Sequence, residues 1–148
     1  MYITYLLLAA IIAISVYGFS NDTLKRRLMF NAYDVVHHQK WYRSFTHAFV
    51  HADWMHLTFN LYVLYVFGVG ERLGGIEPEL VRTYGPKGYM YYGTLYLGGI
   101  LFSTLWSLYK HKDNMHYNAL GASGAISAVV FAYIILNPSA ELGIIFIP

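Results

Sequence analysis

The chain has 148 residues, of which 57% are hydrophobic and only 12% are charged. A typical soluble domain carries about 25% charged residues, so this chain has too few to cover a water-facing surface. It contains no cysteine, which excludes a disulfide framework, a thiolate metal site and a cysteine nucleophile. A net charge of +2 is too small for a nucleic-acid-binding surface, and the 15 Tyr favour the membrane–water interface. The composition indicates an integral membrane protein.

Four apolar segments are expected to cross the membrane as helices, which predicts an all-α polytopic bundle. The first, residues 2–19, carries no charge and approaches the roughly 20 residues that a span needs. A cleaved signal peptide is the rival interpretation, but no Lys or Arg precedes the apolar run, so a retained helix is favoured. The other expected spans are residues 55–70, 89–109 and 119–136.

The connections between these spans differ in character. Residues 21–50 mix basic side chains with aromatic and aliphatic ones, which is typical of short helices lying in the membrane interface. Residues 74–88 contain Gly, Pro and charged residues and are expected to form a connecting loop, and residues 111–118 a short polar loop. The distribution of Lys and Arg places the N-terminus outside. An interfacial position of residues 21–50, called the first loop below, weakens that argument.

A first polar cluster contains His47, His51, His56 and Asn60. Polar side chains in a span are costly, so those present usually serve function or packing. His56 and Asn60 are four residues apart, which puts them on one helix face, where two hydrogen-bond donors suit an oxyanion. Three alternatives stay open: a helix–helix hydrogen bond through Asn60, interfacial packing of the histidines, and a metal site that includes Asp53, although the HExxH spacing is absent.

A second cluster, Gly121-Ala122-Ser123-Gly124-Ala125, begins the fourth expected span. Small residues let two helices approach closely, and close packing is one interpretation of the cluster. The other interpretation is that Ser123 is a nucleophile near a helix N-terminus, whose free N–H groups can stabilise an anion. The pattern by itself leaves both interpretations open.

In this order and spacing, the clusters resemble the rhomboid family of intramembrane serine proteases. The resemblance runs from about Trp41 to Pro138. Its motifs are Trp41-Tyr42-Arg43, His47-x3-His51-x4-His56-x3-Asn60, Glu71-Arg72-Leu73-Gly74 and Gly121-Ala122-Ser123-Gly124.

The resemblance implies a rhomboid-like helical bundle that hydrolyses peptide bonds of transmembrane proteins within the membrane. Ser123 would be the nucleophile of a Ser–His dyad, and an acyl-enzyme would form. The side chains of His56 and Asn60, with the backbone N–H of Ser123, would hold the oxyanion. The substrates would be single-span membrane proteins, and no metal or organic cofactor is implied.

The resemblance also implies structural roles near this site. His51 would be a neighbour of the oxyanion site, and Gly121 and Gly124 would permit tight packing. Arg43 and Glu71 would tie the first loop to the second helix. The first loop would lie on the extracytoplasmic side, against the charge distribution, and the protein would lie in a bacterial cytoplasmic (inner) membrane.

Two departures from the family pattern concern the general base. Position 127, where the family often has an aromatic ring against the catalytic His, is Ser127. The family's base lies two helices after the nucleophile, and no His follows Ser123 in this sequence. His111 and His116 precede Ser123, but no helical register places either beside it.

The expected protein is therefore the N-terminal part of a rhomboid-like domain, inactive by itself, whose partners include the missing C-terminal helices, its substrates and the bilayer. The alternative is a non-catalytic rhomboid-like membrane protein that binds helices through the same groove.

Overall fold

The computed structural model describes residues 2–70 and 74–138. These residues form helices joined by short connections, and within them the only β pairing is an isolated antiparallel bridge between Phe30 and Ala119. The helices are α1 (Ile3–Ser20), α2 (Asp22–Leu28), α3 (Ala32–His37), α4 (Arg43–Thr46), the 3-10 turn η1 (His47–Phe49), α5 (Trp54–Gly68), α6 (Ile76–Tyr84), α7 (Lys87–His111) and α8 (Ser123–Leu136).

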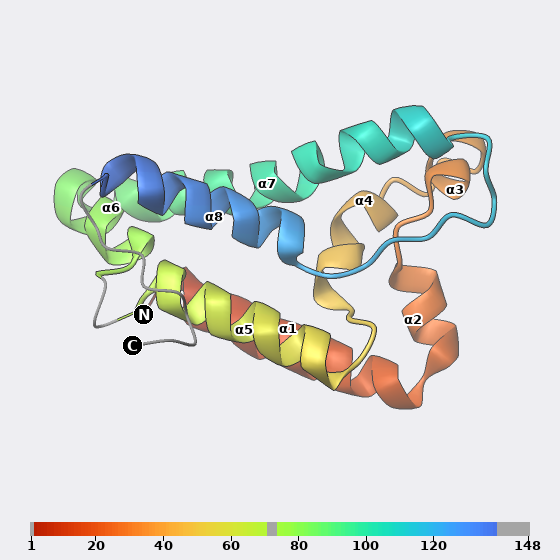
Figure 1. Ribbon diagram of the computed structural model, residues 1–148, viewed down its shortest axis with the longest axis horizontal. Coiled ribbons are helices and arrows are strands. Elements are labelled where there is room, and N and C mark those ends of the chain that lie inside the picture. The colour runs from red at the N-terminus through yellow and green to blue at the C-terminus, as the bar shows by residue number, and fades with distance from the viewer. Residues whose placement is uncertain (1, 71–73, 139–148) are drawn as a thin grey trace.

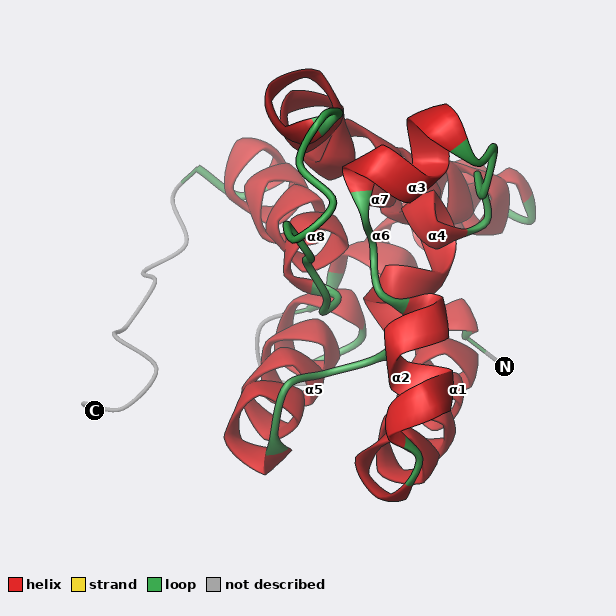
Figure 2. Cartoon of the chain, turned by 90° about the vertical axis from the view of Figure 1, so that its right-hand side faces the viewer, coloured by secondary structure: helices red, strands yellow, loops and turns green. Residues whose placement is uncertain are grey.

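The long helices form two antiparallel pairs. Helices α7 and α8 run side by side along one side of the molecule, and α1 and α5 along the other, with α2, α3 and α4 gathered at one end (Figure 1). Seen from that end, α8 lies above α5, and α1 lies beside α5 (Figure 2). The core between the pairs contains Leu57 and Leu64 of α5, Tyr96 of α7, and Val129 and Tyr133 of α8.

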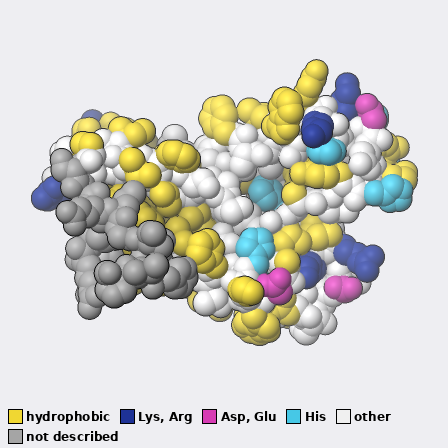
Figure 3. Space-filling view, viewed as in Figure 1, with side chains coloured by type: hydrophobic (Ala, Val, Ile, Leu, Met, Phe, Trp, Pro, Cys, Tyr) yellow, Lys and Arg dark blue, Asp and Glu magenta, His cyan; other side chains and the backbone are white. Residues whose placement is uncertain are grey.

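Large apolar side chains point outward from the bundle, whereas several polar ones are buried inside it. The exposed set includes Phe102 and Trp106 of α7 and Ile135 of α8, at 75%, 67% and 73% of their accessible surface. The buried polar set includes Thr4, Ser15, Asn60, Glu77 and Thr104. Charged side chains gather toward the ends of the long axis (Figure 3). This distribution suits a protein whose sides face lipid, where buried polar groups bind one another and apolar groups face outward.

The helices differ in length from the expected spans. Within residues 2–70 and 74–138, only α1 is both long enough and apolar enough to cross a membrane by length and composition. Helix α8 is apolar but has 14 residues, and α5 has 15. The fourth segment begins as a helix at Ser123 rather than at residue 119, because Ala119 pairs with Phe30 and Gly121 has a positive φ of 108°.

The expected loop at residues 74–88 contains a helix, α6, so that expectation was wrong. Pro78 lies in its first turn, where a helix needs no backbone N–H, and Glu79 favours the positive end of the helix dipole. Glu77 is fully buried and accepts hydrogen bonds from the backbone N–H and the hydroxyl of Thr4, at 2.8 and 2.7 Å. Helix α6 thereby anchors the start of α1.

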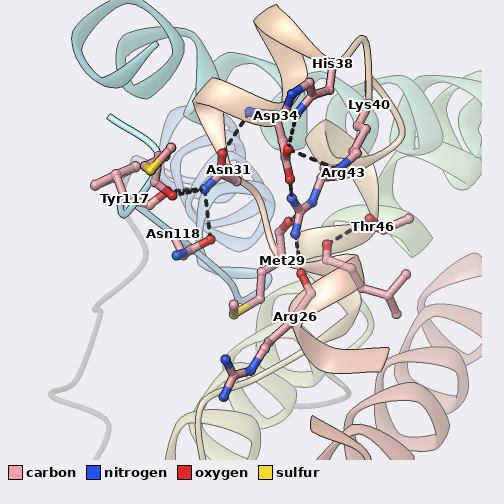
Figure 4. A network of polar contacts seen from close by, with 12 residues as sticks. Arg26, Met29, Asn31, Asp34, His38, Lys40, Arg43, Thr46, Tyr117 and Asn118 are labelled. Atoms are coloured by element: carbon pink, nitrogen blue, oxygen red, sulfur yellow. Dashed lines mark hydrogen bonds and ion pairs between the residues drawn. The ribbon is translucent and has the colours of Figure 1, made fainter. Parts of the chain in front are cut away.

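The first loop is held together by the Arg43 guanidinium, which points into the loop rather than away from it (Figure 4). It forms an ion pair with the Asp34 carboxylate and donates hydrogen bonds to the backbone carbonyls of Arg26 and Met29. Burial raises the pKa of Asp34, but hydrogen bonds from His38 and Lys40 and the Arg43 charge outweigh burial and lower it. The carboxylate therefore stays ionised beside Arg43.

Asn31 joins the first loop to the connection between α7 and α8 (Figure 4). Its side-chain oxygen accepts from the backbone N–H of Asp34 and so caps α3, which leaves its amide nitrogen to act across the loop. That nitrogen donates to the carbonyls of Met115 and Tyr117, at 2.9 and 3.1 Å. With the bridge between Phe30 and Ala119, this contact fixes the path of the chain toward α8.

Candidate active site

Ser123 is the first residue of α8, and its side chain is exposed. The preceding residue, Ala122, makes no side-chain cap, so the first backbone N–H groups of α8 have no capping acceptor from it. Ser127 lies one turn further along the helix and is also exposed. The hydroxyl of Ser123 and the positive end of α8 thus meet at one point.

The imidazole of His56 lies against the backbone immediately before Ser123. A Cβ atom built on Gly121 would lie 2.6 Å from Cε1 and 2.8 Å from Nε2 of His56, distances that real Cβ contacts do not show. Gly121 also has the positive φ of 108° that favours glycine. The absence of a side chain at residue 121 is therefore what lets the His56 ring approach the start of α8.

Two other histidines hold the same stretch of backbone. The N–H of Gly121 donates to the carbonyl of His47 at 2.9 Å, and the N–H of Ala122 donates to Nε2 of His51 at 3.3 Å. The rings of His51 and His56 are in contact, with centroids 4.9 Å apart. The two amides that precede Ser123 are thus bound by the segment that leads into α5.

Burial keeps His47 and His51 neutral. It lowers the pKa of His51 to about 4, with a further lowering by the charge of His56 and a smaller opposing effect of Asp53. Burial also lowers the pKa of His47. A neutral ring at residue 51 has an unprotonated nitrogen, which is what the Ala122 N–H requires.

Asn60 is buried on α5, one turn after His56. Its amide nitrogen donates to the backbone carbonyl of His56 at 2.8 Å. An Asn amide carries two N–H groups, so this bond leaves the second for another acceptor. The structure thus shows a side chain turned toward its own helix, and the oxyanion role stays a prediction.

The packing of α8 on α7 depends on small residues. A Cβ atom at Gly124 would lie 2.3 Å from Cβ of Ser103, and one at Gly99 would lie 2.9 Å from Cα of Ala125. The backbones of the two helices approach each other at this point because neither glycine has a side chain. The nucleophile candidate therefore sits at the end of a tightly packed helix pair.

No hydrogen bond joins the Ser123 hydroxyl to a histidine among the residues that the structure describes. His111, the last residue of α7, stacks on Tyr117 with ring centroids 3.7 Å apart, and His116 is exposed in the connection between α7 and α8. Asp53, considered above as a metal ligand, caps α5 by accepting from the N–H of His56. Within the described ranges, no cluster of three potential ligands for a metal is found.

The structure thus brings together three of the predicted residues, His51, His56 and Gly121, beside Ser123. Arg43 lies in the first loop, where its described partners belong to that loop, and its expected partner Glu71 lies outside the described residues. Sequence reasoning missed Ser15 of α1, which binds His51. The signal was present, since a serine inside an apolar span is itself a reason to look for a partner.

Comparisons with known proteins agree with this arrangement. A family model described as "Rhomboid domain" matches residues 38–148, so the chain belongs to the rhomboid family. The resemblance drawn from the motifs is confirmed, and the protein is an all-α polytopic integral membrane protein. No solved structure matches it significantly.

Two curated relatives show the extent of the similarity. "RHOMBOID-like protein 12, mitochondrial" of Arabidopsis thaliana is 31% identical over 70% of this chain and 32% of its own length. "Presenilin-associated rhomboid-like protein A, mitochondrial" of Danio rerio is 31% identical over 68% of this chain and 24% of its own length. The alignment thus covers no more than about a third of either relative.

Proposed function

We propose that this chain supplies the nucleophile and the oxyanion-binding part of a rhomboid-type intramembrane serine protease. The observation that carries the proposal is the His56 ring seated against Gly121, two residues before an exposed Ser123 at the start of α8. This contact puts a donor-bearing ring, a hydroxyl and helix N-terminal N–H groups at one place, which acyl transfer requires.

The chemistry would follow the usual steps of serine hydrolysis. A histidine base takes the proton of the Ser123 hydroxyl as its oxygen attacks the peptide carbonyl, and later gives that proton to the leaving amine. Negative charge develops on the carbonyl oxygen, where His56, Asn60 and the Ser123 N–H would donate hydrogen bonds. Water then hydrolyses the acyl-enzyme and frees Ser123. The substrates would be transmembrane proteins.

We place the general base outside these 148 residues. Both ring nitrogens of His51 are already hydrogen-bonded, and His56 is needed as a donor. His111 is the last residue of α7 and His116 lies in the connection between α7 and α8, and neither has a hydrogen bond to Ser123 among the described residues. The helices that carry the base are thus part of the proposal, as partners of this chain.

A non-catalytic rhomboid-like membrane protein is the second candidate. One observation favours this candidate: within the described ranges, the Ser123 hydroxyl has no histidine as a hydrogen-bond partner. In that case the exposed serine would have no catalytic role, and a serine-directed reagent would not distinguish it from Ser127.

The test is covalent labelling of the natural full-length protein by a fluorophosphonate probe in detergent micelles. We expect labelling of the wild type and of Ser127→Ala, and none of Ser123→Ala. Removal of one oxyanion donor, in His56→Ala or Asn60→Ala, should slow labelling by a factor of about 100. Equal labelling of Ser123→Ala and wild type, or no labelling of a folded wild type, would favour the non-catalytic candidate.

The membrane in which the protein lies is a separate proposal. The two relatives are named as mitochondrial proteins, and that word describes them rather than this chain. The bacterial cytoplasmic membrane expected from the sequence has no support from these names and stays a prediction. Fractionation of the source cells, with the protein detected by an antibody, decides between the compartments.

A further inference from the structure

We propose that Ser15 of α1 is a positioning residue of this active site, acting through His51 on the backbone that precedes Ser123. The inference rests on the proposed function, and it concerns a residue that has no part in the motifs. Its basis is a chain of hydrogen bonds that begins at the Phe49 carbonyl of η1. The chain passes through the Ser15 hydroxyl of α1 and the His51 ring, and it ends at the Ala122 N–H, one residue before the nucleophile.

The direction of every bond in this chain is determined by its two ends. The carbonyl of Phe49 can only accept, so the single hydroxyl proton of Ser15 points to it, at 2.9 Å. The Ser15 oxygen therefore accepts a hydrogen bond from Nδ1–H of His51, also at 2.9 Å. At the other end, the N–H of Ala122 can only donate, so Nε2 of His51 must be unprotonated. Both ends select the Nδ1–H tautomer.

Ser15 and His51 lie where solvent cannot replace either partner. Ser15 is 1% exposed and His51 is fully buried. The charged or titratable groups facing the ring are His56, which contacts it directly, and Asp53, which acts on it electrostatically. A buried ring without an acceptor for its Nδ1–H carries an unsatisfied donor, and a change of tautomer would turn Nε2–H against the Ala122 N–H.

The consequence for catalysis is positional. The Ala122 amide immediately precedes Ser123, so its anchoring sets the direction of the first N–H groups of α8 and the place of the Ser123 hydroxyl. Small displacements of catalytic groups are costly for rate, whereas the binding of a substrate elsewhere is little affected. Loss of the Ser15 hydroxyl should therefore lower kcat more than it raises KM.

The first arm of the test needs no activity. The natural full-length protein is labelled with isotope-enriched histidine, and the ring nitrogen signals of His51 are assigned by their loss in His51→Gln. We expect the wild type to show a protonated Nδ1 and an unprotonated Nε2 at neutral pH. Ser15→Ala should give a mixture of tautomers, and Ser15→Thr should keep the wild-type form. A protonated Nε2 in the wild type would overturn the proposal whether or not the protein is a protease.

The second arm measures hydrolysis of a transmembrane reporter. Ser15→Ala should lower kcat about tenfold with little change in KM, as expected for the loss of a single buried hydrogen bond, and Ser15→Thr should restore it. Ser20→Ala is the matched control, because Ser20 lies on the same helix, is exposed and bonds only locally to Tyr17. Equal kcat in Ser15→Ala and wild type would contradict the proposal. Activity that does not depend on Ser123 would instead contradict the proposed function and leave the tautomer result intact.

Discussion

The His56 imidazole occupies the space that a side chain at Gly121 would need. A Cβ atom at residue 121 would lie 2.6 Å from the Cε1 atom of this ring. Because Gly121 lies two residues before Ser123 and His56 belongs to α5, one close contact joins the two motifs that are separated by more than sixty positions along the chain.

Gly121→Ala should therefore damage both folding and the site. The positive φ alone costs a non-glycine residue about 1–3 kcal/mol, and the methyl group must also displace the His56 ring. We expect a lower melting temperature in detergent and loss of fluorophosphonate labelling at Ser123. Gly93→Ala is the control, because a Cβ atom there meets nothing within 4 Å and φ is not positive, so it should be neutral or stabilising. Equal melting temperatures for both variants would argue against the contact.

Gly124→Ala should push α8 away from α7. Its methyl group would lie 2.3 Å from Cβ and Oγ of Ser103, so the variant should melt below the wild type. Ser103→Gly removes both atoms and should by itself cost about 0.5 kcal/mol through helix propensity. We expect the double variant to lose less free energy of unfolding than the two single variants lose in sum. A double-mutant cycle measures this difference. Additive effects would contradict the proposed contact.

Glu77→Gln should loosen the start of α1. The buried carboxylate accepts from the N–H groups of Ile3 and Thr4 and from the Thr4 hydroxyl, and a glutamine amide turns one of these acceptors into a donor. Hydrogen bonds to charged groups contribute about 1.5–3 kcal/mol, so a clear fall in melting temperature is expected. Glu79→Gln, on the same helix but only partly buried, is the control. A similar fall in both variants would show that the charge, and not the buried site, matters.

The stability of the fold should decrease in mildly acidic solution. The pKa of His51 is about 4 in the folded protein and near 6.5 when unfolded, so between these values the unfolded chain binds more protons. Stability is therefore fully present above pH 6.5 and is lost as the pH falls toward 4, by at most about 3 kcal/mol at ~1.4 kcal/mol per unit. The melting temperature should depend less on pH across this range in His51→Gln than in the wild type. An unchanged slope in that variant would assign the effect to other groups.

Part of this architecture could be predicted because local patterns determine it. The apolar runs correspond to helices, and the spacing of His56 and Asn60 places both on α5. Helix α6 was missed because its charges and the glycines on either side of it are typical of a loop, although Pro78 and Glu79 near its start are also signals of a helix N-terminus.

The partners of several buried polar groups could not be predicted, because folding brings each pair together and the local sequence does not identify the partner. Arg43 binds Asp34 within the first loop, whereas its predicted partner, Glu71, lies outside the described residues. Ser15 reaches His51, and Glu77 reaches Thr4, only after α1 has packed on α5 and α6. A polar residue in an apolar run shows that a partner is needed, but not which residue supplies it.

The most direct test of the account is hydrolysis of a single-span transmembrane reporter by the full-length protein in proteoliposomes. The account predicts cleavage by the wild type and by Ser127→Ala, whose serine lies exposed one turn along the same helix, and no cleavage by Ser123→Ala. Cleavage by Ser123→Ala at the wild-type rate would show that Ser123 is not the nucleophile.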